Sequence, residues 1–158
     1  MNILVFSDTH GKVANMVAAI GRFPEISTII HLGDYGTDVD RLRSSFPDHQ
    51  FFSVSGNCDS TRTYPAEQIL ELAGTTLLLT HGHLYGVKDR ISALVERAKE
   101  VGAAMVLYGH SHKPLIQREE GVLVLNPGSA SFPRTMPRAS YAILTLGAGE
   151  PRARILDL

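Results

Sequence analysis

The chain has 158 residues, the size of a single domain whose hydrophobic core needs no disulfide or structural metal. Its 15 Lys and Arg side chains nearly balance 16 Asp and Glu side chains, which excludes general electrostatic binding to nucleic acid or anionic membranes. A lone cysteine, Cys58, excludes an intrachain disulfide, and the longest apolar stretches are too short to span a membrane. Because an apolar strand pattern starts at the first residues, without a basic or long apolar leader, we expect one cytoplasmic domain over residues 1–158.

Apolar runs bounded by turn signals alternate with amphipathic segments in the first part of the chain. The expected strands are Asn2–Ser7, Thr28–Leu32 and Phe51–Ser55, and the expected helices are Val13–Phe23 and Val39–Phe46. A proline, Pro24 or Pro47, follows each helix. This strand–helix alternation predicts a mostly parallel, buried sheet.

Glycine-containing turns divide the rest of the chain into hairpins, one further strand and one helix. The expected strands are Gln68–Leu72, Thr75–Thr80, Ala104–Tyr108, Leu115–Arg118, Val122–Asn126, Ser140–Leu146 and Arg152–Leu156. The expected helix, Asp89–Val101, has Asp89 as its cap and ends at Gly102, and its apolar stripe is Ile91, Leu94, Val95 and Ala98. About ten strands and three helices predict an α/β fold, a four-layer αββα sandwich of two mixed β-sheets flanked by helices.

Side chains that commonly bind metals stand where five of these strands should end. They are Asp8 and His10 in FSDTHG, Asp34 in HLGD, Asn57 in SGNCD, His81 after Leu77–Thr80, and His110 and His112 in YGHSH. Each motif alone is compatible with an ordinary polar turn. Because ligands bind beyond the carboxyl ends of strands in open α/β sheets, the five motifs together predict one shared metal site.

The chemistry of this set favours two divalent ions. Asp34 is the natural bridging ligand, because a carboxylate can offer one oxygen to each ion, and Asp8 adds a second negative charge. The remaining ligands are neutral, so the site keeps a net positive charge that suits a phosphate ester. Mixed oxygen and nitrogen ligands without thiolate favour Mn²⁺, Fe, Zn²⁺, Ni²⁺ or Co²⁺. Two such ions can clamp the attacking and leaving oxygens of an in-line displacement.

The ordered set D-x-H, GD, GN, a lone His and GH-x-H resembles the calcineurin-like metallophosphoesterase family, from Asp8 to His112, about two-thirds of the chain. The short length, GNCD, and NPGS followed by PR are similar to its small YfcE-like and Vps29-like phosphodiesterase branch. The resemblance implies a phosphodiesterase with Mn²⁺ as the first expectation and Ni²⁺, Zn²⁺, Fe or Co²⁺ as alternatives, a small phosphate-ester substrate and, by analogy alone, a homodimer. It implies one ion on Asp8, His10, Asp34 and His112, and a second on Asp34, Asn57, His81 and His110, with a bridging hydroxide as nucleophile.

The residue after Asn57 departs from the family pattern. Most members have a histidine that stabilises the phosphoryl group or protonates the leaving group, and this chain has Cys58. A thiol, with an ordinary pKa of about 8.5, is a weak hydrogen-bond partner. We therefore expect diesters with good leaving groups to be preferred over unactivated monoesters. Asp59, whose counterpart orients that histidine, is either a supporting residue or a turn residue here.

Several roles stay open from the sequence. The resemblance favours His81 over His83 as the ligand, which leaves His83 near the substrate among the expected catalytic residues Asp34, Asn57, Cys58 and His83. Arg134 either binds phosphate or is solvated, His31 is expected in the core, and His49 is expected at the surface. The rival functions are a Vps29-like protein-interaction scaffold without catalysis, and a phosphomonoesterase or nucleotide hydrolase on the same metal site.

Overall fold

The computed structural model describes residues 1–60, 63–133 and 138–158. Within these ranges the chain forms ten strands, three α-helices and one short 3-10 helix. In chain order they are β1 (Asn2–Phe6), α1 (Ala14–Arg22), β2 (Thr28–His31), α2 (Asp38–Ser45), β3 (Gln50–Ser53), β4 (Glu67–Leu72), β5 (Thr75–Thr80), η1 (His83–Tyr85), α3 (Ser92–Glu100), β6 (Met105–Leu107), β7 (Leu115–Glu119), β8 (Val122–Asn126), β9 (Ser140–Thr145) and β10 (Arg152–Asp157).

The first sheet has the strand order β10-β9-β1-β2-β3. β1, β2 and β3 are parallel, as the alternation of strands and helices predicts, and β9 and β10 add an antiparallel pair beside β1. β1 is apolar on both faces: Ile3 and Val5 pack toward the other sheet, while Leu4 and Phe6 pack toward the helices. A strand buried on both sides in this way reads as a continuous apolar run rather than an alternating pattern.

The second sheet has the order β4-β5-β6-β8-β7. Its hairpins β4–β5 and β7–β8 turn at Ala73-Gly74 and Glu120-Gly121. Both residues of each turn have positive φ, 48° and 74° in the first and 47° and 84° in the second. This backbone matches the twist of antiparallel strands, and glycine in the second position carries it without strain.

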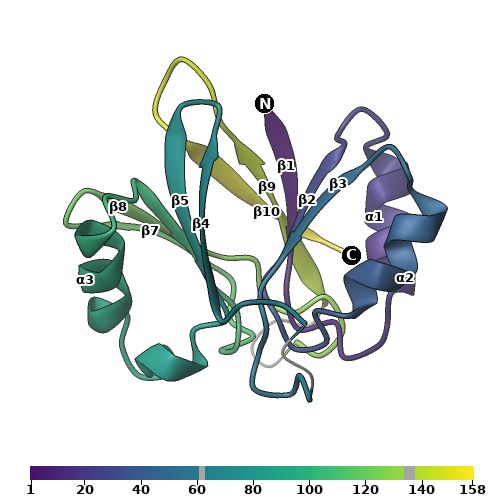
Figure 1. Ribbon diagram of the computed structural model, residues 1–158, viewed down its shortest axis with the longest axis horizontal. Helices are drawn as coiled ribbons and strands as arrows, with labels where there is room; N and C mark the ends of the chain where they lie inside the picture. The colour runs from purple at the N-terminus through teal and green to yellow at the C-terminus, as the bar shows by residue number, and fades with distance from the viewer. Residues whose placement is uncertain (61–62, 134–137) are drawn as a thin grey trace.

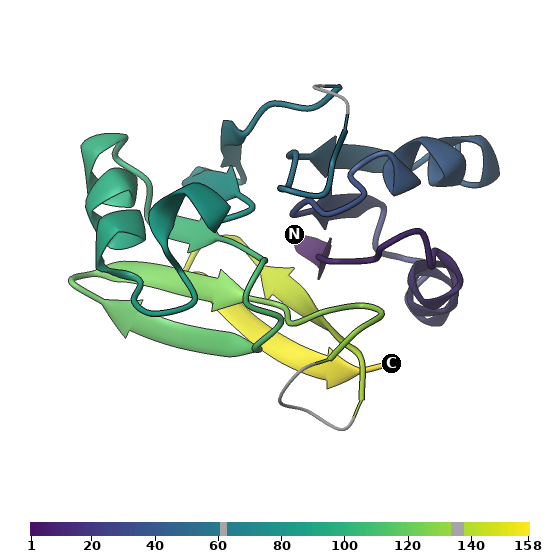
Figure 2. The same ribbon diagram turned by 90° about the horizontal axis from the view of Figure 1, so that it is seen from below.

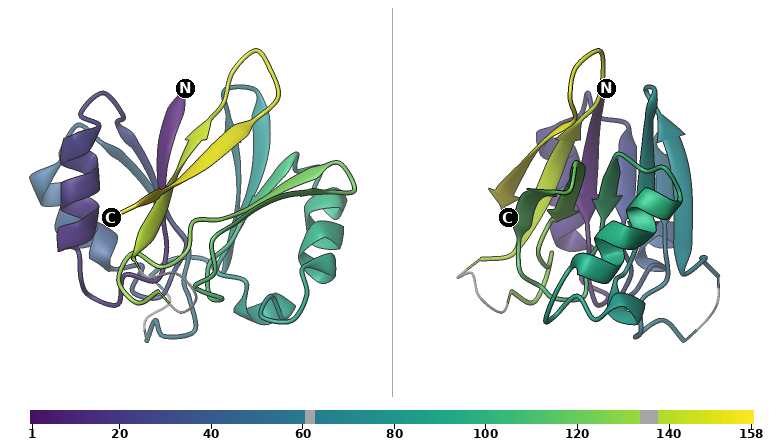
Figure 3. Two further views of the ribbon diagram at one scale, coloured as in Figure 1. Left: turned by 180° about the vertical axis from the view of Figure 1, so that it is seen from behind. Right: turned by 90° about the vertical axis from the view of Figure 1, so that its left-hand side faces the viewer.

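The four-layer αββα sandwich is confirmed (Figure 1). One buried apolar cluster lies between the two sheets. A second lies between the first sheet and helices α1 and α2, and a third between the second sheet and α3. Views from behind and from the side place α3 on the opposite outer face from α1 and α2 (Figure 3).

The structure corrects the start of the third helix. α3 begins at Ser92, and the side chain at its N-cap position makes no hydrogen bond, so Asp89 is not the predicted cap. Instead, the backbone N–H of Asp89 donates to Gly86 O at 3.1 Å and closes a turn that follows η1, an element missed in the sequence. Three members of the predicted apolar stripe, Leu94, Val95 and Ala98, are buried, whereas Ile91 precedes the helix and is half-buried against the same cluster.

The carboxyl ends of the parallel strands meet at one end of the sandwich. β1 runs away from the N-terminus toward the lower end in Figure 1, and Figure 2 looks directly at that end. The loops after β1, β2, β5 and β6 are therefore brought together there from both sheets. Across the described ranges, no helix combines the length and apolar character needed to cross a membrane.

Candidate metal centre

The polar residues predicted at strand ends converge into two groups with one member in common. Potential ligand atoms within 4.8 Å of one another come from two sets of residues, one of Asp8, His10, Asp34 and His112, the other of Asp34, His81 and His110. Asp34 belongs to both groups. The structure therefore brings together six of the seven predicted ligands in an arrangement that can hold metal ions.

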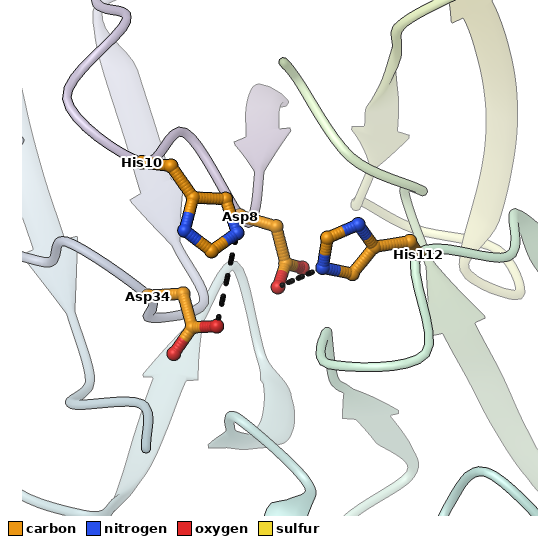
Figure 4. Close-up of side chains that lie close together, drawn as sticks. All are labelled: Asp8, His10, Asp34 and His112. Carbon is orange, nitrogen blue, oxygen red and sulfur yellow. Dashed lines mark ion pairs between the residues drawn. The ribbon is translucent and has the colours of Figure 1, made fainter. Parts of the chain in front are cut away.

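The two carboxylate oxygens of Asp34 face different histidines. Oδ1 lies 3.3 Å from His81 Nε2. Oδ2 lies 3.9 Å from His10 Nε2, and a dashed line marks this ion pair in Figure 4. Oδ1 also accepts a hydrogen bond of 2.9 Å from the Cys58 backbone N–H. Burial alone would raise the pKa of Asp34, but His81 and the Cys58 N–H outweigh it and hold that pKa well below its usual range. Asp34 is thus an anion positioned to contact two neighbouring cations.

The two carboxylate oxygens of Asp8 have different surroundings. Its Oδ2 accepts hydrogen bonds from Ser7 Oγ at 2.6 Å and from the His110 backbone N–H at 3.1 Å. Its Oδ1 is buried without a hydrogen-bond partner among the described residues and lies 3.1 Å from His112 Nε2 (Figure 4). One oxygen therefore ties two loops together, and the other faces the first group.

The ring orientations of His81 and His112 turn Nε2 toward a carboxylate. His81 Nδ1 lies 2.7 Å from Leu32 O, and His112 Nδ1 lies 2.6 Å from Phe132 O. Because a carbonyl only accepts, each Nδ1 must donate, and the Nε2 lone pair of the neutral ring then faces a carboxylate. A metal-binding histidine is held in this way by its second nitrogen.

The donor set fits a divalent cation. His81 Nε2 and Asp8 Oδ1 are both buried and, within the described part of the chain, have no hydrogen-bond partner. Such orphaned polar atoms are destabilising unless a proton or cation lies between them. In the metal-free protein a proton on His81 partly fills this role. Burial lowers the pKa of His81, but the Asp34 and Asp8 carboxylates outweigh burial and raise that pKa above its ordinary value.

Most of the predicted ligands sit on strained backbone. Asp8, His10, Asp34, His110 and His112 have positive φ values of 55°, 48°, 54°, 63° and 57°. Left-handed backbone costs a residue with a side chain about 1–2 kcal/mol. Strain of this kind gathers at functional sites and persists because the surrounding fold imposes it. These turns bring side chains from alternating loop positions, such as Asp8 and His10, into the two groups.

Two glycines allow the loops to approach the carboxylates. A Cβ on Gly109 would collide with Ser7 Oγ and lie 2.9 Å from Asp8 Oδ2, and one on Gly56 would collide with Asp34 Oδ1. The backbone of each loop therefore packs directly against the side chain of a predicted ligand. This explains why glycine precedes Asn57 and His110 in their motifs.

A buried network behind the ligands holds the loop between Asp8 and His10. Thr9 Oγ1 donates to Asp38 Oδ2 at 2.7 Å and lies 3.0 Å from His31 Nε2. Because the Thr9 proton is engaged by Asp38, His31 must donate from Nε2, and its Nδ1 then accepts from the Gly33 N–H at 3.2 Å. His31 is fully buried, as predicted, and the neutral ring satisfies both neighbours.

His31 should make the fold sensitive to mild acid. Burial lowers the pKa of His31 from 6.5 to about 4. Between pH 6.5 and pH 4 the unfolded chain therefore binds a proton on His31 that the folded chain does not bind. The free energy of unfolding falls as the pH drops through this window. Over that window His31 accounts for a loss of up to about 3 kcal/mol.

Denaturant unfolding of chelator-treated protein at several pH values tests this expectation. The free energy of unfolding of the wild type should fall more steeply between pH 6.5 and pH 4 than that of His31→Gln, which carries no titrating ring. Parallel curves for the two proteins would contradict the role given to His31.

The remaining predicted site residues lie at the rim. Asn57 lines the crevice above the ligands, and its amide donates to Cys58 Sγ at 3.4 Å. Asp59 accepts from the backbone N–H groups of Gly36 and Gly56 at 2.9 and 2.6 Å. It therefore ties two loops together, which answers the open question in favour of a loop-holding role.

His83 lies beside the second group without joining it. Its ring centroid is 5.5 Å from that of His81 and 6.1 Å from that of His110. Of these two histidines, His81 is the one whose ring nitrogen belongs to the second group. Burial and the neighbouring charge of His81 lower the pKa of His83, so its ring is neutral near pH 7.

Cys58 is exposed and remains a thiol. Although the residue is exposed, partial desolvation of the thiol first, and the Asp34 carboxylate second, raise the pKa of Cys58 to about 11. A thiolate nucleophile at neutral pH is therefore disfavoured. Cys58 lines the crevice and can contact a bound ester without supplying a proton efficiently.

Sequence reasoning gave no role to four crevice residues and described the surroundings of one histidine only in part. The four residues line the same crevice as the predicted ligands, and only their position in loops next to the motifs could have pointed to them: Tyr35, Lys88, Phe132 and Pro133. His49, expected at the surface, is half-buried: its ring centroid lies 5.2 Å from that of Phe46, and its ring nitrogens have no hydrogen-bond partner among the described residues. Arg134 lies outside the described residues.

Comparison with known proteins gives relatives over nearly the whole chain. Residues 1–149 match the profile of the calcineurin-like phosphoesterase superfamily domain. The chain is 35% identical to the probable metallophosphoesterase YsnB of Bacillus subtilis, over 99% of this chain and 91% of YsnB. It is also 35% identical to the phosphodiesterase YfcE of Escherichia coli, over 91% of this chain and 87% of YfcE. A crystal structure of Vps29 from Entamoeba histolytica, complexed with Zn²⁺, covers 99% of both chains with a TM-score of 0.78; at 19% identity it shares the fold.

Proposed function

Because this chain belongs to the calcineurin-like phosphoesterase superfamily, we propose that it is a phosphodiesterase that works with two divalent metal ions. The observation that carries the proposal is the pair of ligand groups that share Asp34. Its two oxygens face separate histidines, and buried polar atoms beside it have no hydrogen-bond partner in the described structure.

The first ion would be held by Asp8, His10, Asp34 and His112, and the second by Asp34, Asn57, His81 and His110. Two such ions, of which Mn²⁺ is the first candidate, would lower the pKa of bound water and supply a hydroxide nucleophile at neutral pH. A crevice about 590 Å³ in volume lies over these residues and leaves room for an ester.

The residues of the chain itself bind and orient the phosphate. Lys88, an exposed cation at the crevice wall, is placed to attract the phosphoryl oxygens. The charge of Lys88 acts on the site. Burial first, His81 second and Lys88 third lower the pKa of His110 to about 4. His83, as a neutral ring beside the second group, can donate a hydrogen bond to a phosphoryl oxygen.

The deciding experiment combines metal analysis with ester hydrolysis. We expect close to two metal ions per chain after loading with Mn²⁺, and chelator-sensitive hydrolysis of bis(p-nitrophenyl) phosphate that exceeds hydrolysis of p-nitrophenyl phosphate. Bound metal without turnover of either ester would favour the scaffold alternative. A reversed preference would favour the phosphomonoesterase or nucleotide hydrolase.

Cys58→His should extend the activity toward poorer leaving groups. A histidine at this position can protonate the departing oxygen, which Cys58 with its raised pKa does poorly. We expect about a tenfold gain in kcat/KM on phenyl phosphate. This gain is smaller than the one an evolved general acid supplies, because Asp59 accepts hydrogen bonds from backbone N–H groups and cannot orient the new histidine ring.

Cys58→Ser is the matched control, because it changes the side chain without adding an acid that titrates near pH 7. Kinetics on phenyl phosphate and p-nitrophenyl phosphate should show the gain for the histidine variant chiefly on the poorer leaving group. If the two variants behave alike on phenyl phosphate, Cys58 is not the position from which a leaving group can be protonated.

A further inference from the structure

The metal crevice is larger than a phosphate group needs. Its volume of about 590 Å³ falls within the range of roughly 300–1,000 Å³ that is usual for small-molecule sites. A phosphoryl group on the metal ligands would fill only a small part of it. The side chains of the upper walls therefore decide which ester groups are accepted.

The two most exposed aromatic rings among the described residues lie in these walls. Seven large hydrophobic side chains are exposed among the described residues, and the aromatic ones among them are Tyr35, 42% exposed, and Phe132, 47% exposed. Both line the crevice. Exposed apolar side chains that gather beside polar residues can mark a ligand-binding groove, whereas single scattered ones need no explanation.

Both rings flank the predicted ligand His10. The Tyr35 and Phe132 ring centroids lie 5.6 and 5.5 Å from that of His10, at interplanar angles of 61° and 70°. An ester group of a phosphate bound beside His10 would therefore lie within reach of both rings.

Tyr35 is held outward by its backbone. It has a φ of 75° and follows Gly33 at 90° and Asp34 at 54°. Positive φ in a bulky residue is a genuine outlier. Tyr35 carries no predicted ligand atom, so metal binding alone does not account for strain at this residue. The strained turn directs its ring into the crevice.

Phe132 is fixed from several sides. Its backbone N–H donates to Ser129 Oγ at 2.8 Å, and its carbonyl accepts from His112 Nδ1 at 2.6 Å. The Lys12 ammonium lies 3.8 Å from the ring centroid. A cation at this distance both orients the ring and adds positive charge near the crevice.

We propose that Tyr35 and Phe132 bind a planar aromatic group of the substrate, so that the substrate class is a phosphodiester of a nucleoside. This proposal rests on the proposed phosphodiesterase function. Rings beside cations suit a flat, polar base, whereas an alkyl ester such as a glycerol phosphodiester would gain little from them. Stacking of a base on an aromatic side chain corresponds to roughly a 5- to 150-fold effect.

The test compares two diesters with the same leaving group, thymidine 5′-(p-nitrophenyl phosphate) and methyl p-nitrophenyl phosphate. The Mn²⁺-loaded wild type should hydrolyse the nucleoside ester with the higher kcat/KM. Tyr35→Ala and Phe132→Ala should each lower the ratio of the two kcat/KM values by roughly 5- to 150-fold. Ile69→Ala, which removes an exposed apolar side chain from β4, should leave the ratio unchanged.

Lys88→Met separates stacking from charge, because it should lower kcat/KM for both esters by the same factor and preserve the ratio. A wild-type ratio near one, or an unchanged ratio in both aromatic variants, would overturn the proposal while leaving the phosphodiesterase intact. If neither ester is hydrolysed, the proposed function fails. Calorimetry with thymidine 5′-monophosphate and methyl phosphate then tests the aromatic subsite by itself. Equal affinities for the two compounds reject the subsite.

Discussion

Asp34→Asn is expected to release both metal ions and to lower kcat/KM for bis(p-nitrophenyl) phosphate by more than about 100-fold. Loss of a residue that only hydrogen-bonds to a metal ligand can already lower activity by up to about 100-fold. Asp34 is the member common to both ligand groups. Asparagine has one oxygen and no charge, so it cannot balance two cations. Elemental analysis and steady-state kinetics on the same preparation measure both effects.

The variant should still fold, because the asparagine oxygen can accept the hydrogen bond from the Cys58 N–H. Asp48→Asn, at an exposed turn position, is the matched control for loss of one carboxylate. Full metal content with wild-type turnover in Asp34→Asn would show that Asp34 does not bridge the ions. Loss of one ion alone would assign it to a single group.

Loading with Mn²⁺ is expected to raise the thermal midpoint of the chelator-treated protein by roughly 5–10 °C for each site saturated to about 100 times its Kd. Folding alone leaves Asp8 Oδ1 and His81 Nε2 buried without hydrogen-bond partners, within the part of the chain that the structure describes. A cation satisfies both atoms only in the folded state, so binding stabilises that state.

Differential scanning calorimetry with and without Mn²⁺ measures this shift. Asp34→Asn provides the matched control, because its fold is kept while its site is not, and it should show little shift. Identical midpoints for the wild type in Mn²⁺ and in chelator would mean that the two groups do not bind the ion. The scaffold alternative would then be preferred.

The sandwich could be predicted from the sequence because its signals are local. β1 contains a continuous apolar run, Ile3–Phe6, and the hairpin turns at Ala73-Gly74 and Glu120-Gly121 lie between the strands predicted to flank them. The convergence of Asp8, Asp34 and His110 could also be predicted, because each follows a strand and the carboxyl ends of neighbouring parallel strands meet.

The walls of the crevice could not be predicted in the same way. Tyr35 and Phe132 reach it through loop conformations, a positive φ in one case and hydrogen bonds to Ser129 and His112 in the other. Neither carries a periodic signal. The start of α3 was missed because the backbone of Asp89 closes a turn with Gly86, which competes with the capping role that its residue type indicates.

The left-handed backbone at five of the predicted ligands has an evolutionary consequence. Glycine at any of the five positions, Asp8, His10, Asp34, His110 or His112, would relieve the backbone strain that these residues bear. Random substitution there can therefore raise the stability of the metal-free fold while it removes a ligand. Natural selection for the chemistry of the site therefore has to remove such stabilising substitutions repeatedly. A descendant released from catalysis should shed these residues early and keep the sandwich, so that loss of the chemistry is easy and its recovery is rare.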